Sequence, residues 1–190
     1  PTSFDPQNHQ GQTKLEILKA QADNPEDSFP GWTVHLLQPS NLQDLEHSIP
    51  KGIASIPRQG QGKTQGEDSL RSDLEANKTP IEYLSTIQQA QDNPTSPYFQ
   101  ESGLTPEDWI LAFMTHLTET GLPLDDYGRD IVCVTYLTGA FFPSVNNSSF
   151  VPCAYWSRDY RQAVLYGHDP RDRVGRIGVR SSVMIQNLVP

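Results

Sequence analysis

The stretch from Trp156 to Arg180 constrains the fold of this chain more than any other. It holds six arginines, and the pair Asp169-Pro170 marks a turn near its centre. It ends in Ile177-Gly178-Val179-Arg180, and the residues up to Ile185 continue the apolar, β-branched character. Such a run predicts a buried strand over residues 177–185. The stretch therefore predicts a β-rich core with an arginine-rich loop beside it.

The order of motifs in this stretch resembles the C-terminal end of the formylglycine-generating-enzyme-like domain, a variant of the C-type lectin fold. That end carries G-G-S-W, then R-x-A, then a loop with D-P and R, and finally I-G-F-R. The matching residues are Trp156, Arg161-Gln162-Ala163, Asp169-Pro170 with Arg173, and Ile177-Gly178-Val179-Arg180. This chain departs from the pattern at Cys153-Ala154-Tyr155, which replaces G-G-S, and its gap from Trp156 to Arg161 is short.

A helix over residues 106–120 precedes that segment. Thr105-Pro106-Glu107-Asp108 has the composition of a capped helix start. The helix is expected to bury a continuous face made by Trp109, Ile110, Phe113, Met114 and Leu117. It ends in Thr120-Gly121-Leu122-Pro123, which resembles the T-G-L-P turn of the same family, whereas the R-L-P-T-E-A-E-W-E run that normally follows is absent. The resemblance implies an α+β fold, a compact and minimal C-type-lectin-like domain.

Further elements follow from local patterns. Thr79-Pro80-Ile81-Glu82 predicts a helix start, with Ile81, Leu84 and Ile87 as its apolar stripe. Apolar runs predict a central strand at 131–137, a second strand at 150–156 and a short one at 33–37. Short helices are expected at 13–22 and at 40–49, and Gly and Gln enrichment makes 57–78 read as a linker. We therefore expect an extended N-terminal arm of short helices and linker over 1–78 and the lectin-like domain over 79–190.

Charge is distributed unevenly along the chain. The net charge is -9, yet residues 151–190 carry six arginines against three aspartates. The acidic remainder lacks the extended basic face that general nucleic-acid binding needs. No apolar run approaches the ~20 residues that span a bilayer, so no membrane insertion is expected. The first residues also lack the pattern of a signal peptide.

Two cysteines, Cys133 and Cys153, are too few for a disulfide framework. Both lie in apolar runs, which predicts two buried free thiols. Free thiols are typical of a reducing, cytoplasmic compartment, and a virion is the other location we expect.

Catalytic and metal chemistry find little support in the sequence. The oxidases of the family need two cysteines close together in the terminal segment, and only Cys153 lies there. The five histidines show no ligand spacing, and Asp125-Asp126 and Asp169/Asp172 lack the alternating oxygens of a calcium loop. Gly62-Lys63-Thr64 has Pro57 where a phosphate-binding loop needs glycine. We expect no enzyme activity, no cofactor and no metal, although an enzyme with a polar pocket invisible in the sequence is a third class.

The resemblance implies a recognition surface instead. In family members whose terminal segment is diversified by retroelements, residues between the tryptophan and I-G-F-R are displayed outward and bind protein or other macromolecular targets. Here the ligand-binding positions would be Tyr155, Arg158, Asp159, Tyr160, Tyr166, His168 and Arg171. Tyrosine and arginine suit that role. Tyr160 and Tyr166 could equally fold inward as core aromatics, and Arg161, Gly178 and Arg180 are assigned to the scaffold.

Two functional classes remain open. The first is a non-enzymatic binding module that displays a Tyr/Arg-rich loop on a C-type-lectin-like scaffold. The alternative is a structural subunit of a larger assembly, such as a virion or injection device, whose N-terminal arm clamps its neighbours. The second class predicts a homo-oligomer, and the first predicts a monomer or small oligomer.

Overall fold

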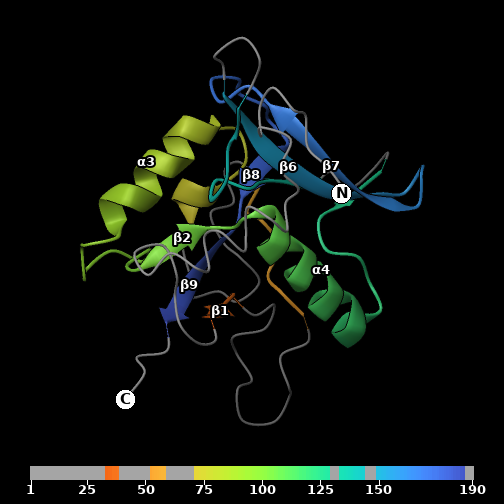
Figure 1. The fold of residues 1–190 in the computed structure, drawn as a ribbon, viewed down its shortest axis with the longest axis horizontal. Helices are drawn as coiled ribbons and strands as arrows, with labels where there is room; N and C mark the ends of the chain where they lie inside the picture. The colour runs from red at the N-terminus through yellow and green to blue at the C-terminus, as the bar shows by residue number, and fades with distance from the viewer. Residues whose placement is uncertain (1–32, 39–51, 59–70, 129–132, 144–148, 187–190) are drawn as a thin grey trace, which may run out of the picture.

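The C-terminal strand of this protein pairs with two strands from much earlier in the chain. The computed structural model describes residues 33–38, 52–58, 71–128, 133–143 and 149–186. Its smaller sheet holds three antiparallel strands in the order β1-β9-β2, namely β1 (Thr33–Leu36), β9 (Ser181–Gln186) and β2 (Glu101–Gly103). This pairing confirms the expected early strand and brings it beside β9, the last strand of the described residues (Figure 1).

The larger sheet holds six strands and is built around one long hairpin. Its members are β3 (Asp126–Tyr127), β4 (Val134–Tyr136), β5 (Phe142–Pro143), β6 (Ser149–Ser157), β7 (Gln162–His168) and β8 (Ile177–Val179). The order is β3-β6-β4-β8, and β5 and β7 also pair with β6. The strand predicted at 150–156 is confirmed. The strand predicted at 131–137 is confirmed over 134–136 only, and residues 131 and 132 lie outside the described residues.

The terminal apolar run forms two strands in different sheets, so the prediction of one buried strand over 177–185 is wrong. β8 pairs in parallel with β4, whereas β9 joins the smaller sheet. The chain leaves the larger sheet at Arg180, whose buried guanidinium bonds to Asp125. Gly178 is needed here because an added Cβ would lie 2.3 Å from Cγ2 of Ile56.

Two helices begin where the sequence predicts. α3 (Pro80–Ala90) starts with a capping box between Thr79 and Glu82, and α4 (Pro106–Thr120) starts with one between Thr105 and Asp108. Each box pairs backbone N–H groups that would otherwise lack partners in the first turn. α4 ends at Gly121, whose φ of 71° is the left-handed conformation that glycine favours.

The buried faces of the helices differ from the predicted ones. On α3, Ile81 is 49% exposed, and Tyr83 takes the inward position. The Tyr83 hydroxyl bonds to the backbone of residues 75, 78 and 177, which explains why an aromatic residue lies there. On α4, Ile110 is 46% and Met114 54% exposed, so the continuous face predicted for this helix is wrong. The inward stripe of α4 consists of Trp109, Ala112 and Phe113.

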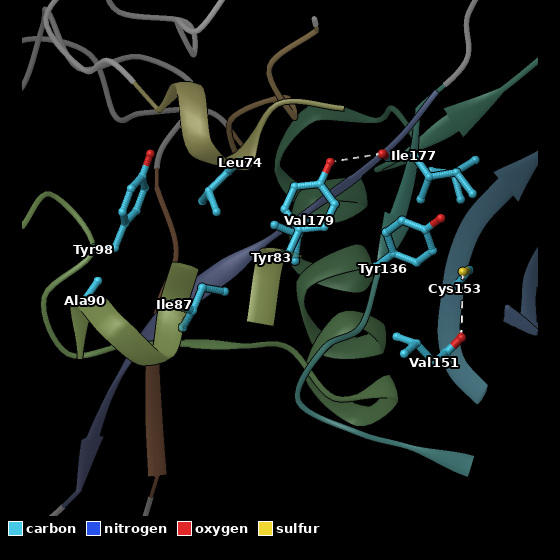
Figure 2. Packing of buried hydrophobic residues seen from close by; sticks show 11 residues of the cluster. Leu74, Tyr83, Ile87, Ala90, Tyr98, Tyr136, Val151, Cys153, Ile177 and Val179 are labelled. Atoms are coloured by element: carbon cyan, nitrogen blue, oxygen red, sulfur yellow. Dashed lines mark hydrogen bonds between the residues drawn. The ribbon is translucent and has the colours of Figure 1, made fainter. Parts of the chain in front are cut away.

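Successive residues of β6 contact two separate hydrophobic clusters. Val151 and Cys153 belong to a cluster with Tyr83, Ile87 and other buried residues of the α3 side (Figure 2). Ala154 and Trp156 belong to a cluster with α4, in which Trp156 stacks on Phe113 at 5.8 Å. Because strand side chains alternate between faces, α3 and α4 cover opposite faces of the larger sheet.

The described parts of the predicted N-terminal arm pack into the same core. Ala54, Ile56 and Leu74 are buried. The Arg71 side chain bonds to Glu101 at 3.0 Å and to Ser181 at 2.9 Å. Residues 71–78 are therefore not a linker, contrary to prediction. The helices predicted at 13–22 and 40–49, and the Gly62-Lys63-Thr64 segment, lie outside the described residues.

Candidate functional site

The β6–β7 hairpin brings three of the predicted ligand-binding residues to one face of the sheet. Tyr166 pairs with Cys153 and His168 pairs with Val151, so both side chains lie on the face that carries the α3 cluster. Tyr155, two residues after Cys153, lies on the same face. The hairpin is the longest paired segment of the fold, since its register runs without a break over residues 151–157.

Aromatic rings form a continuous row on this face. The centroids of Tyr127 and Tyr155 are 5.0 Å apart, those of Tyr155 and Tyr166 are 6.0 Å apart, and those of Tyr166 and His168 are 6.1 Å apart. His168 also meets buried Tyr136 edge to face at 5.8 Å. These separations and tilts are the favoured geometries for aromatic pairs. The row therefore holds its rings in fixed positions.

A pocket of about 210 Å³ opens above this row. Two buried side chains, Val134 and Ile177, lie in its floor. Its walls are Tyr127, Tyr155, Tyr166 and His168 from the row, with Val174 and Arg176 from the loop between β7 and β8. No carboxylate lines the pocket among the residues that the structure describes.

Arg176 is the only arginine or lysine among the lining residues that the structure describes. Its guanidinium lies 5.5 Å from the centre of the Tyr127 ring, and the residue is exposed. Arg158 and Arg173 differ from it, because they pair with Asp126 and Glu82. Within the described ranges no carboxylate forms an ion pair with Arg176. Its charge is therefore free to meet a ligand.

Two hydroxyls of the pocket, those of Tyr155 and Tyr166, have raised pKa values and stay protonated at neutral pH. Burial raises the pKa of Tyr155, with a further contribution from Tyr127. Burial also raises the pKa of Tyr166, and the neighbouring Cys153 adds to the effect. Each phenol therefore offers one donor and one acceptor to a ligand at neutral pH.

The other predicted positions lie around the pocket rather than in it. Arg158, Asp159 and Tyr160 occupy the turn between β6 and β7, and Arg171 lies on the loop after β7. All four are exposed, Tyr160 by 75%, which excludes the inward position for this tyrosine. Tyr166 is intermediate between the two alternatives, with 37% of its surface exposed while its ring belongs to the row. The ligand role of these residues stays a prediction.

Of the three residues assigned to the scaffold, two lie inside the protein and one lies at its surface. Arg180 is buried, and Gly178 is closely packed. Arg161, by contrast, is exposed in the turn with a left-handed φ of 51°. The assignment of Arg161 to the scaffold is therefore not matched by a buried position, because its side chain lies at the exposed tip of the hairpin.

Sequence reasoning missed Tyr127, Val174 and Arg176. Tyr127 lies in the segment that replaces the expected family motif, where no pattern assigned it a role. Arg176 was visible only as one of several arginines in the terminal stretch. The missing signal is the pairing of β3 with β6, which brings Tyr127 beside Tyr155 from 28 positions away. No local pattern carries that information.

A buried polar centre lies near α4, away from the pocket. The Asp125 carboxylate accepts hydrogen bonds from Arg180 at 2.6–3.0 Å and from the Trp109 indole at 2.9 Å. Burial is the largest influence on Arg180 and opposes its charge, but the ion pair and hydrogen bonds with Asp125, together with Cys133, raise the pKa of the guanidinium overall. The Cys133 thiol donates to the same carboxylate at 3.3 Å. Burial, aided by Asp125, raises the pKa of this thiol to about 12.

These contacts bear on the metal candidates Asp125-Asp126 and Asp169/Asp172, and on whether His168 has an acidic partner. Asp125 and Asp126 are both engaged by arginines, so neither offers an open carboxylate. His168 approaches the side chain of Asp172 at 3.9 Å rather than that of Asp169. Within the described ranges no three His, Cys, Asp or Glu side chains are placed to hold a metal ion. Both cysteines are free, and Cys153 is fully buried.

A larger hollow of about 430 Å³ lies beside α4. Leu36, Leu37, Ile53 and Leu111 give it an apolar lining, and Asp108 and Glu119 lie at it as well. The two acidic side chains already have partners, because Asp108 bonds to Thr105 and Glu119 accepts from the Gly52 amide. His35 also lines this hollow, and its ring lies between Asp108 at 3.3 Å and Ser182 at 2.9 Å, so its polar atoms are engaged within the protein.

Comparison of the chain with protein-family models, curated proteins and solved structures gives no match. In the part of the chain that the structure describes, no helix has the length and apolar character needed to cross a membrane. The site is therefore interpreted from its own geometry.

Proposed function

We propose that this protein is a non-enzymatic binding module that recognises a protein ligand through the β6–β7 hairpin. The observation that carries the proposal is the row of partly exposed aromatic rings beside Arg176, which has no carboxylate partner among the residues that the structure describes. Tyr160 and Arg171 extend the same surface outward on exposed turns. Tyrosine and arginine are the residue types that contribute most to the energy of protein interfaces.

The rigidity of the hairpin supports a recognition role. Seven consecutive residue pairs hold β6 against β7. A paired strand presents its side chains at fixed spacing, so binding costs less conformational entropy than it would on a free loop. The β6–β7 hairpin is therefore suited to act as a preorganised binding surface.

The C-type-lectin-like scaffold, and within it the formylglycine-generating-enzyme-like variant, is part of the proposal. Two observations support it. The helix that ends at Gly121 packs against the hairpin through the stacked rings of Phe113 on α4 and Trp156 on β6. The final Ile177-Gly178-Val179-Arg180 motif forms a buried edge strand of the larger sheet, followed by the buried guanidinium of Arg180. The terminal part of the motif therefore occupies buried positions, whereas Arg161-Gln162-Ala163 and Arg173 of the same motif are exposed.

The thiols favour binding over catalysis. Burial raises the pKa of Cys133 and of Cys153 to about 12 in each case. A thiol with such a pKa is protonated at neutral pH and is a poor nucleophile and metal ligand. This argues against the cysteine chemistry of the oxidases that the terminal segment resembles.

A structural role in a larger assembly is the second candidate, and one observation favours it. Ile110, Leu111 and Met114 leave an exposed apolar face on α4, and Leu36 lies exposed beside the same hollow. Exposed apolar surface of this kind is typical of an interface. Size-exclusion chromatography with light scattering separates the candidates, because an assembly subunit forms large oligomers and a binding module does not.

A random peptide library displayed on phage tests the leading proposal. Peptides selected on the wild-type protein should lose at least tenfold in affinity for Tyr160→Ala and Arg171→Ala. They should bind Leu165→Ser with unchanged affinity, because Leu165 lies on β7 with a similarly exposed side chain (45%) but on the opposite face from Tyr166. Selected peptides that bind all three variants equally would rule out the hairpin as the recognition surface.

A further inference from the structure

The aromatic pocket has a size that limits what it can hold. Its volume of about 210 Å³ is below the roughly 300 Å³ at which pockets for whole small molecules begin. It therefore suits a single ring or one side chain. Val134 and Ile177 in the floor are buried strand residues that face each other across the β4–β8 pairing, so the floor is rigid.

The lining defines the chemistry of the ligand. Tyr155 and Tyr166 meet at an interplanar angle of 83°, which presents one ring face and one ring edge to the same space. A flat ring placed there can make both stacked and edge-to-face contacts. Val174 adds an apolar wall from the loop. The interior of the pocket consequently favours an aromatic ring.

The charge of the pocket selects the sign of the ligand. Arg176 lines it without a carboxylate partner in the described part of the chain, and the lining holds no acidic side chain there. The loop between β7 and β8 carries an exposed acid, Asp172, whose carboxylate lies 3.9 Å from the His168 ring. Tyrosine faces alone would attract a cation, but a cation here would meet the guanidinium of Arg176. That guanidinium can instead bind a carboxylate through two parallel hydrogen bonds.

We infer that this pocket binds an aromatic ring that carries a carboxylate, with the ring against Tyr155 and Tyr166 and the carboxylate on Arg176. The inference concerns the hairpin surface and rests on the proposed binding function, which it makes specific. Two sources supply this chemistry. One is a free aromatic acid, and the other is the C-terminal aromatic residue of a protein ligand, which bears its own α-carboxylate.

Titration of the full chain with small probes, followed by NMR of backbone amides, tests the inference. Benzoate represents the free acid, and N-acetylphenylalanine represents a C-terminal residue. Benzamide and N-acetylphenylalanine amide have the same shapes without the charge, and benzylammonium reverses it. At least one of the two acids should cause saturable shifts on β6, β7 and residues 174–177, with a Kd on the order of 1 mM for so small a contact. Its neutral amide should bind at least tenfold more weakly.

Variants locate the carboxylate. Arg176→Gln should weaken the acid at least tenfold, whereas Arg161→Gln, which changes an exposed arginine outside the pocket, should leave the affinity unchanged. Unchanged spectra of β8 would show that Arg176→Gln is folded. Preference for benzoate over N-acetylphenylalanine identifies a free acid as the source, and the reverse preference identifies a chain terminus. Equal binding of acid and amide, tighter binding of benzylammonium, or no binding of either acid would overturn the inference.

The two proposals fail separately. If selected peptides depend on Tyr160 and Arg171 but are neither displaced by the acids nor weakened by Arg176→Gln, the hairpin is an interface and the carboxylate site is wrong. If the acids bind as expected and the peptide library yields nothing that depends on the hairpin, the pocket binds small acids and the protein-recognition proposal is wrong.

Discussion

Removing the charge of Asp125 should destabilise the protein more than any other single isosteric change. The Asp125 side chain is 0% exposed and its partner Arg180 is 7% exposed. In Asp125→Asn the volume is kept, and asparagine tolerates the left-handed φ of 54° at this position. The guanidinium of Arg180 would then be buried without a counter-charge. Breaking a buried pair in this way costs roughly 3–5 kcal/mol.

A further loss comes from geometry. The carboxylate serves Arg180 on one side and the Trp109 indole on the other. An amide has only one acceptor oxygen, so its NH₂ group must face a donor. We therefore expect a loss of about 4 kcal/mol, a large part of the roughly 5–15 kcal/mol that an ordinary domain possesses. With a urea slope of about 2 kcal/mol per M, the midpoint should fall by about 2 M.

Urea unfolding followed by tryptophan fluorescence measures this effect, and two further variants make it specific. Adding Arg180→Met to Asp125→Asn should restore at least about 2 kcal/mol, because the uncompensated charge is removed. Arg173→Gln, which breaks the exposed pair with Glu82, should cost less than about 1 kcal/mol. A cost under about 1 kcal/mol for Asp125→Asn, or no recovery in the double variant, would refute the view that this pair is a buried structural charge.

Three other predictions concern stability. Tyr83→Phe should cost about 1–2 kcal/mol in urea unfolding, because its hydroxyl bonds to three backbone groups; an unchanged midpoint would contradict this. Thr105→Ala should cost about 1 kcal/mol through loss of the capping box, whereas calorimetry should find no loss for the mid-helix control Thr115→Ala. Burial, with the nearby Arg180, lowers the pKa of His116, whose Nδ1 accepts from the Ile53 amide at 2.9 Å. The contribution of neutral His116 to the free energy of unfolding should be complete above about pH 6.5 and be lost as pH falls through the lower folded pKa. His116→Gln should flatten the dependence of the free energy of unfolding on pH in this range, and equal slopes in the variant and the wild type would refute the assignment.

The origin of the His116 effect follows from its charge balance. Arg180 opposes protonation, whereas Asp125 and Glu119 favour it, and burial is the largest influence. In the unfolded chain none of these acts, so below about pH 6.5 the unfolded chain takes up a proton at His116 more readily than the folded protein does. Acid therefore weakens the attachment of residues 52–53 to α4, and acid sensitivity of this contact is the expected signature.

Helix starts and strand positions were predictable because their causes are local. The capping boxes at Thr79 and Thr105 use residues three positions apart, and both form as predicted. Gly121 ends α4 for an equally local reason. The run before Trp156 reads as a strand in the sequence and is one. The inward faces of the helices were predicted less well, because the face of a helix that is buried depends on what lies opposite, as Tyr83 and Ile110 illustrate.

The sequence by itself determined an α+β fold with two capped helices, a β-rich C-terminal segment, free thiols and a terminal cluster of arginines. Only the tertiary structure decided that β8 and β9 separate at Arg180. It also decided that the Arg180 guanidinium pairs with the Asp125 carboxylate. It also decided that Tyr127 and Arg176, 49 positions apart, line one pocket with Tyr155. Turns and caps form within a few residues, whereas strand partners and side-chain pockets depend on which distant segments pack together, and that choice belongs to the free energy of the whole fold.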